Sequence, residues 1–335
     1  MITRRIGIDL GTSQTRIYHP RKGIVISEPT VVATNVDRGE IEAVGAEALE
    51  MIGRTPESIA AYYPLKDGVI ADFRVTQKLL KYFVQKAIGR MHLRSPEIML
   101  SVSSGATSTE RRAALDAARG SGSQQVHIIQ SSVAAALGAA VPINLPTGNL
   151  VIDIGAGTTE IAVISLSGIV SQNSIRVGGK AINDNISSYI RHKYGLSIGG
   201  QTAEEVKHIL GSALPVEKPQ TMTVPGRDLI EGLPKRIEID SNELVPSIEE
   251  VLEKIVFAIR SVIEKTPPEL VSDIIDHGIT LTGGGAQLNN LDNLLAKIIN
   301  VPVTIAQDAP LCVAKGTGIA LTNLEDYRRS SLGIQ

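Results

Sequence analysis

The sequence predicts an α/β protein built from two related domains that face each other. Predicted strands alternate with predicted helices along most of the chain, which is typical of α/β folds. A strand pair with an Asp before a Gly/Thr turn occurs at Asp9 and again at Asp153, 144 residues later. The 335 residues are enough for about two domains of roughly 150 residues each. Two copies of one unit indicate a duplicated domain and not a solenoid.

In the first half, apolar residues alternate with small or polar ones over 6–10, a Gly-Thr-Ser turn follows, and a second strand is expected over 15–18. Thr107 and Glu110 have the spacing of a capping box, which predicts a helix after Thr107. An Ala-rich stretch predicts another helix over 131–140, where a proline follows closely.

In the second half, the segment 151–164 repeats the strand, Gly/Thr turn and strand of the N-terminus. Thr202 with Glu205, and Ser247 with Glu250, have capping-box spacing, so we expect two helices to begin there. The second of these has the clearest apolar face of the chain.

The remaining C-terminal segments predict a strand, a glycine turn and a helix over 279–288, and a final helix from Pro310. The stretch 215–246 is rich in Pro and Gly and suggests an inserted subdomain.

Charge and cysteine content exclude several classes of protein. The chain holds 33 Lys and Arg against 35 Asp and Glu, for a formal net charge of −2, so we expect no nucleic-acid partner. The single cysteine, Cys312, rules out a disulfide within the chain and a cysteine-based zinc site.

No apolar run reaches the ~18 residues that span a bilayer, and no signal peptide is evident. We therefore expect a soluble cytoplasmic protein, with peripheral membrane binding left open.

Three glycine turns suggest a phosphate site: 11–13, 155–158 and 283–285. Glycine lets backbone amides approach an anion closely, and consecutive N–H groups form a nest for it. Asp9 and Asp153 end the strands before the first two turns. Carboxylates beside phosphates require a cation between them, which predicts Mg²⁺ held mostly through water. A single turn of this kind would be an ordinary hairpin turn, but a matched pair with a third turn favours phosphate binding.

Other nucleotide and hydrolase motifs are missing from the sequence. It contains no P-loop, no G-x-S-x-G and no H-E-x-x-H. The run GAGTTE has Glu160 at the third glycine of a dinucleotide fingerprint and lies in a strand pair.

Several motifs resemble those of the actin-like ATPases. IGIDLGTSQTRIY is similar to their first phosphate motif, VIDIGAGTTEIAVISLSGIV to their second, and ITLTGGGAQL to their adenosine motif. GIVISEPTVVA, PLKDGVIADF, STERRAALDAAR, GRDLIEGLPKRIEI and VAKGTGIAL resemble, more narrowly, the MreB family of bacterial actin homologues, from about Ile6 to Leu324. The resemblance implies an actin-like (ribonuclease-H-like) duplicated two-domain α/β fold with a nucleotide cleft between the domains.

The resemblance also implies ATP or ADP with Mg²⁺ in the cleft and ATP-dependent polymerisation. It implies filaments at the inner face of the cell membrane that guide cell shape and act with proteins of cell-wall synthesis. The domain boundaries expected from it are 1–144 plus 311–335 for domain I, with a small inserted subdomain at about 33–65, and 145–310 for domain II, with an inserted subdomain at about 179–246.

Site residues carry over from the family motifs position by position. Those expected at the nucleotide are Thr12, Ser13, Gln14, Gly155, Ala156, Gly157, Glu204, Glu205, Val206, Lys207, Gly283, Gly284, Gly285 and Ala286, with Asp9 and Asp153 at the metal. From the residues alone, Glu204 and Lys207 fit a solvated i,i+3 pair on a helix equally well.

The expected hydrolytic site departs from the family pattern. Relatives carry E-E-P before the Ala-rich helix, and the second Glu orients the attacking water; here Gln130-Ser131-Ser132 stands in its place. Ser131 has no charge, and Gln130 is displaced by about 100° on a helix. Thr158 remains to bind the water. We therefore predict slow ATP hydrolysis, unless Gln130 aligns the water instead. Asn183 also replaces an acidic residue of the family.

The segment GRMHLRSPE places Met91 and Leu93 between two arginines, where the family has a membrane-inserting loop. Two apolar side chains flanked by cations suit an anionic membrane surface. A connection between a helix and a strand with a half-buried Leu explains the segment equally well.

Two other functions stay open on the sequence. One is a small-molecule kinase on the same fold, which would need a general base and a substrate pocket in the cleft. We see no further carboxylate with a claim to that role. The other is a non-hydrolysing scaffold that binds nucleotide only to hold its cleft shut.

Overall fold

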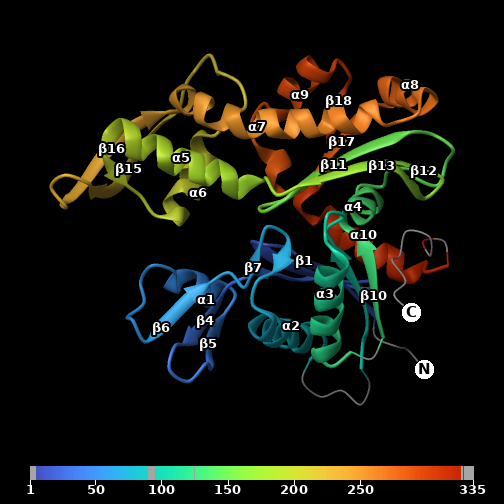
Figure 1. The fold of residues 1–335 in the computed structure, drawn as a ribbon, viewed down its shortest axis with the longest axis horizontal. Helices are drawn as coiled ribbons and strands as arrows, with labels where there is room; N and C mark the ends of the chain where they lie inside the picture. Colours follow the sequence, from blue (N-terminus) through green and yellow to red (C-terminus); the bar gives the residue numbers. More distant parts are fainter. Residues whose placement is uncertain (1–4, 90–94, 124, 326, 328–335) are drawn as a thin grey trace.

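The computed structural model describes residues 5–89, 95–123, 125–325 and 327. It has two halves, each built on a five-stranded sheet (Figure 1). The sheet of the first half has the strand order β10-β9-β1-β2-β3. Its strands are β1 (Arg5–Leu10), β2 (Gln14–His19), β3 (Gly23–Pro29), β9 (Glu97–Val102) and β10 (Gln125–Gln130).

The sheet of the second half repeats this arrangement, with the order β13-β12-β11-β17-β18. Its strands are β11 (Asn149–Ile154), β12 (Thr159–Ser165), β13 (Gly168–Ile175), β17 (Ile279–Thr282) and β18 (Val303–Ile305). In both sheets, three antiparallel strands are extended by two parallel ones. This common topology confirms the predicted α/β class and the duplicated strand pair.

The two hairpins also match in register and in their turns. Asp9 lies opposite Arg16 across β1 and β2, and Asp153 lies opposite Glu160 across β11 and β12. The Gly11 N–H donates to the Gln14 carbonyl at 3.1 Å, and the Gly155 N–H to the Thr158 carbonyl at 2.8 Å. Each half therefore presents an aspartate beside a tight glycine turn.

Helices cover both sheets. Those of the first half are α2 (Phe73–Ile88), α3 (Ser108–Gly120), α4 (Ser131–Gly138) and α10 (Cys312–Thr322), and those of the second are α5 (Gly179–Tyr194), α6 (Gly200–Leu210), α7 (Ser241–Glu264), α8 (Pro268–His277) and α9 (Leu291–Ile299). α4 and α10 lie side by side between the two sheets (Figure 1). Their backbones approach so closely that a methyl group at Gly316 would lie 1.7 Å from the Ala134 carbonyl oxygen.

Two small sheets and a short hairpin complete the fold. One small sheet holds β4 (Val32–Asn35), β5 (Ile41–Val44) and β6 (Ile59–Tyr62) beside α1 (Ala46–Met51); the other holds β14 (Leu196–Ser197), β15 (Thr221–Asp228) and β16 (Pro234–Asp240). The hairpin consists of β7 (Leu65–Lys66) and β8 (Val69–Ile70), and two 3₁₀ turns are η1 (Gly284–Gln287) and η2 (Ala309–Leu311). Both small sheets lie at the same end of the molecule, on the left in Figure 1.

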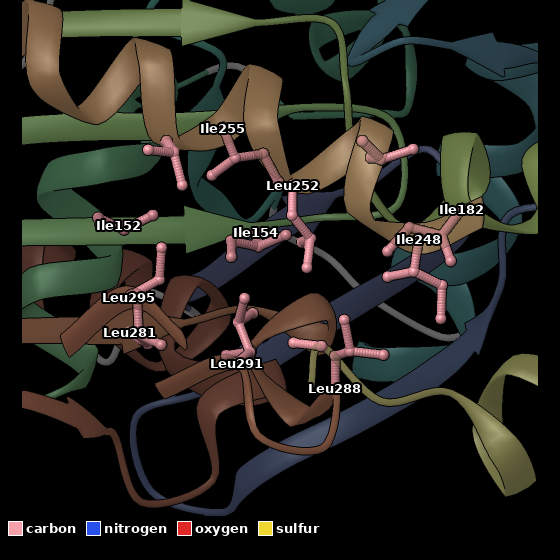
Figure 2. Packing of buried hydrophobic residues seen from close by; sticks show 14 of the residues in the cluster. Ile152, Ile154, Ile182, Ile248, Leu252, Ile255, Leu281, Leu288, Leu291 and Leu295 are labelled. Atoms are coloured by element: carbon pink, nitrogen blue, oxygen red, sulfur yellow. The ribbon is translucent and has the colours of Figure 1, made fainter. Parts of the chain in front are cut away.

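A large apolar core positions the second half of the cleft. Leu252 and Ile255 of α7 project onto Ile152 and Ile154 of β11 (Figure 2). All four side chains are at most 2% exposed. Burial of this size stabilises each side chain by about 2–3 kcal/mol relative to exposure. The glycine turn after Ile154 therefore starts from a firmly held strand.

The predicted capping boxes have mixed outcomes. The box at Thr107 and Glu110 is confirmed, with hydrogen bonds in both directions. The other two are wrong. Helix α6 begins two residues before Thr202, with no side-chain cap, and α7 begins at Ser241, where the Asp240 carboxylate accepts the Glu243 N–H.

A proline, Pro246, directly precedes Ser247, where the sequence predicted the start of this helix. It lies inside the helix, in the second turn, where it removes only one backbone hydrogen bond. The Asp240 cap and the fully buried Leu244 hold the turn before it. The Ser247 hydroxyl donates to the Leu244 carbonyl and does not cap the helix.

Candidate functional site

A cleft of about 1080 Å³ lies between the two halves. All three glycine turns predicted from the sequence line it, at 11–13, 155–158 and 283–285. They come from β1–β2, β11–β12 and the end of β17, which are far apart in the chain. The structure thus brings the predicted phosphate loops together at one site.

At one end of the cleft, the two hairpin turns almost touch. A methyl group at Gly157 would lie 2.6 Å from Thr12 Oγ1 and 3.0 Å from the Cα of Asp67. A larger residue would collide there, so glycine lets the two turns approach each other closely. This is the geometry expected of a phosphate cradle supplied by both halves.

The turn at Asp67 and Gly68 also belongs to this end, and the sequence reasoning did not identify it. The Gly68 N–H donates to Thr12 Oγ1 at 2.9 Å, and Gly68 lies against the Thr158 side chain. Asp67 and Gly68 both have positive φ, 49° and 79°. An Asp-Gly pair with two positive φ angles is the strongest local signal for a tight hairpin, so the sequence PLKDGVI carried this information.

The two predicted metal-binding carboxylates lie in the cleft. Asp9 accepts a hydrogen bond from Ser101 Oγ at 3.2 Å, and Asp153 from Thr282 Oγ1 at 3.0 Å. Burial raises the pKa of Asp9, opposed by the charge of Arg16. Burial, and then repulsion from Asp9, raises the pKa of Asp153 to about 7.

A divalent cation would relieve this repulsion, because it stabilises both ionised carboxylates. Among the described residues, no group of three or more His, Cys, Asp and Glu could hold a metal ion. Two carboxylates leave most coordination positions to water and phosphate oxygens, which is how Mg²⁺ is usually held. The donor set therefore fits Mg²⁺ in company with a polyphosphate.

Glu160 ties the two halves together beside the second glycine turn. It is 1% exposed, and its carboxylate accepts hydrogen bonds from Ser103 Oγ at 2.6 Å, Ser174 Oγ at 2.9 Å and the hydroxyl of Ser104. Ser103 and Ser104 follow β9 of the first half, whereas Ser174 lies on β13 of the second. The sequence reasoning missed this role, because only the fold brings the serines to Glu160.

Glu204 and Lys207 of α6 line the cleft, where Lys207 lies beside Gly179, whose N–H donates to the Gly155 carbonyl of the second glycine turn. Lys207 Nζ donates to the Gly179 carbonyl at 3.2 Å, and burial lowers the pKa of Lys207. Residues three and four apart share a helix face, which explains why these two point into the cleft.

Three other residues predicted at the nucleotide have side chains that lie outside the cleft lining. Glu205 is exposed, outside the cleft lining, and Val206 is fully buried in the apolar core, since both lie on other faces of α6. Ala286 is fully buried beneath the third glycine turn. None of these three side chains lines the cleft.

The mouth of the cleft is bridged by one hydrogen bond between the small-sheet regions. Gln201 Nε2, on α6, donates to the backbone carbonyl of Leu49, on α1, at 2.7 Å. Tyr63 and Ile52 line the cleft beside this bridge. This hydrogen bond links the two halves of the molecule across the cleft.

Of the three residues predicted for hydrolysis, Ser131 and Thr158 line the cleft and Gln130 does not. Gln130 ends β10 directly before α4, and its Oε1 is buried without a hydrogen-bond partner. This placement makes Gln130 a poor candidate for aligning water. Asn183 lines the cleft, with its Oδ1 buried and unpartnered.

The predicted membrane loop, with Met91 and Leu93, lies outside the described residues. In the part of the chain that the structure describes, no helix has both the length and the apolar character needed to cross a membrane.

Known sequences resemble this chain along nearly its whole length. The family model described as MreB/Mbl protein matches residues 3–329. The chain is 46% identical over 330 residues to the cell shape-determining protein MreB of Escherichia coli strain K12, covering 97% of this chain and 95% of that protein. It is 44% identical over 332 residues to the cell shape-determining protein Mbl of Bacillus subtilis strain 168, covering 99% of this chain and 100% of that protein.

Solved structures share the fold. The crystal structure of MreB 5 of Spiroplasma citri bound to AMPPNP matches with a TM-score of 0.92 and 38% identity, over 97% of this chain and 98% of that chain. The MamK double helical filament matches with a TM-score of 0.80, over 96% of this chain and 99% of that chain, at 21% identity, which supports the fold alone. These matches confirm the predicted actin-like α/β fold.

Proposed function

Because the chain belongs to the MreB/Mbl family, we propose that it is an actin-like cell-shape protein that binds ATP or ADP in its central cleft and polymerises into filaments. The observation that carries this proposal is the meeting of two glycine turns, one from each half, at the phosphate end of the cleft. The S. citri relative bound to AMPPNP and to ADP supports an adenine nucleotide as the ligand.

In this proposal the polyphosphate lies between the turns at Thr12 and Gly157, with Mg²⁺ between it and the carboxylates of Asp9 and Asp153. The adenosine lies near Glu204 and Lys207 of α6. Nucleotide that contacts both halves favours the closed arrangement, because it binds that state more tightly than an open one.

We further propose that ATP hydrolysis is slow. Ser131 lines the cleft where relatives carry the water-orienting Glu, and its hydroxyl has neither the length nor the charge of a carboxylate. A positioning or basic residue contributes about 10²–10⁴-fold to such a reaction. Thr158 alone would therefore sustain only a low rate, and filaments would persist.

The proposed location is the inner face of the cell membrane, in contact with proteins of cell shape and wall synthesis. The family of the chain and the apolar residues Met91 and Leu93 support it. Each residue contributes little affinity by itself, so membrane binding would depend on many copies along a filament. Liposome co-sedimentation of the wild type and the Met91→Ser, Leu93→Ser double variant tests this part, and equal pelleting would exclude a role for the segment.

We also propose the domain division 1–144 plus 311–335 and 145–310, with inserted subdomains at about 33–65 and 179–246. Helix α10 follows the segment 145–310 in the chain but packs on α4, β1 and β9 of the first half. These contacts support the assignment of 311–335 to domain I.

Electron microscopy of the purified protein with ATP–Mg²⁺, AMPPNP–Mg²⁺, ADP–Mg²⁺ or no nucleotide tests the central proposal. We expect filaments with nucleotide and none after Gly157→Val, which places a side chain against Thr12. Gly199→Ala serves as the control, because no atom lies within 4 Å of its added methyl group. The absence of filaments under every condition would favour the kinase alternative.

A further inference from the structure

Arg16 places a positive charge in the cleft, beside the carboxylate of Asp9. It lies on β2, directly opposite Asp9, and its side chain is 18% exposed. Arg16 lines the cleft, yet its Nε is buried without a hydrogen-bond partner. Nη1 of Arg16 and Oδ2 of Asp9 lie 3.7 Å apart, which makes an ion pair but is too long for a hydrogen bond.

The other half of the molecule provides an internal comparison. Glu160 holds the position in the second hairpin that Arg16 holds in the first, since each lies opposite the aspartate before the glycine turn. Glu160 accepts hydrogen bonds from three serines. The carboxylate of Glu160 is therefore fully hydrogen-bonded, whereas Arg16 has only an ion pair with Asp9 and an Nε without a hydrogen-bond partner.

A guanidinium that is only 18% exposed and has an unpartnered Nε is costly unless an acceptor reaches its N–H groups. Arginine stays protonated and offers donors in a planar fork that suits phosphate oxygens. Asp9 and Asp153 already place two carboxylates here, so an incoming polyphosphate meets strong repulsion. Both Mg²⁺ and Arg16 can offset that repulsion, because each brings positive charge to the same end of the cleft.

We propose that Arg16 binds the polyphosphate of the nucleotide at the floor of the cleft and takes over part of the role of the divalent cation. Nucleotide then stays bound when divalent cations are removed. This inference rests on the proposed function, because it requires a nucleotide in the cleft.

The test is a titration of ADP and AMPPNP by calorimetry, in Mg²⁺ and in EDTA, with the wild type, Arg16→Gln and Arg16→Lys. Loss of a hydrogen bond to a charged group corresponds to about tenfold or more in affinity. We expect Arg16→Gln to lose at least about tenfold in EDTA and clearly less in Mg²⁺, where the cation compensates. Arg16→Lys retains the charge and should recover most of the affinity in EDTA.

Arg112→Gln on α3 is the matched control, because that arginine side chain is 78% exposed and lies outside the cleft lining. Melting curves without nucleotide verify folding, and Arg16→Leu replaces Arg16→Gln if the latter does not fold. Equal losses with and without Mg²⁺, or no loss, would overturn the inference.

A loss confined to Mg²⁺ would show instead that Arg16 only positions Asp9. If the wild type bound no nucleotide in either buffer, the proposed function itself would fail. If the wild type bound nucleotide and Arg16→Gln bound it equally well, only the inference about Arg16 would fail.

Discussion

Asp153 should make the nucleotide-free, metal-free protein less stable at alkaline than at mildly acidic pH. Asp153 is 8% exposed, and its carboxyl has a pKa of about 7, raised by burial and by repulsion from Asp9. Its ordinary pKa is 3.8. Asp153→Asn removes the titration while keeping an oxygen that accepts the Thr282 hydroxyl.

The magnitude follows from the two pKa values. Between pH 3.8 and about 7 the folded carboxyl holds a proton that the unfolded chain has lost, so stability falls as the pH rises. Each unit of pKa shift is worth about 1.4 kcal/mol, so a gap of about three units costs up to about 4 kcal/mol above pH 7. Below pH 3.8 both states are protonated and the cost disappears.

Urea unfolding in EDTA, at pH 5 and pH 8, measures this difference. We expect the wild type to lose more stability than Asp153→Asn over that interval, by about 2–3 kcal/mol. Asp276→Asn, at an exposed position on α8, should behave like the wild type. An equal loss in the wild type and Asp153→Asn would refute the reasoning that a buried charge at this position is costly.

Three further outcomes are expected. Ser131→Glu should raise the rate of phosphate release from ATP–Mg²⁺ by about 10²-fold or more, whereas Gln130→Ala should leave that rate unchanged. A fast wild-type rate that collapses in Gln130→Ala would show instead that Gln130 aligns the attacking water. Gly316→Ala should destabilise the protein by about 2–3 kcal/mol in denaturant titrations, because its methyl group would meet the Ala134 carbonyl at 1.7 Å; an unchanged midpoint would contradict the close packing of α4 and α10. Gln201→Ala removes the hydrogen bond to α1 across the cleft mouth and should speed the release of a fluorescent nucleotide by up to about tenfold, while an unaltered dissociation rate would show that this bridge does not hold the cleft closed.

The sequence alone determined the features that depend on neighbouring residues. Alternating apolar residues and a glycine turn identified both hairpins, and the box at Thr107 and Glu110 identified the start of α3. Even the Asp67–Gly68 turn was present as a local signal. Such features follow from backbone sterics and short-range hydrogen bonds, which a few consecutive residues specify.

The tertiary structure decided which residues meet and what charge they carry. Periodicity places Glu204 and Lys207 on one helix face, but only the packing of α6 turns that face to the cleft and Val206 to the core. The unpartnered Nε of Arg16, the hydrogen-bonded carboxylate of Glu160 and the raised pKa of Asp153 all depend on groups distant in the chain and on exclusion of water. Burial and long-range charge are properties of the folded surroundings, so no short stretch of sequence could determine them.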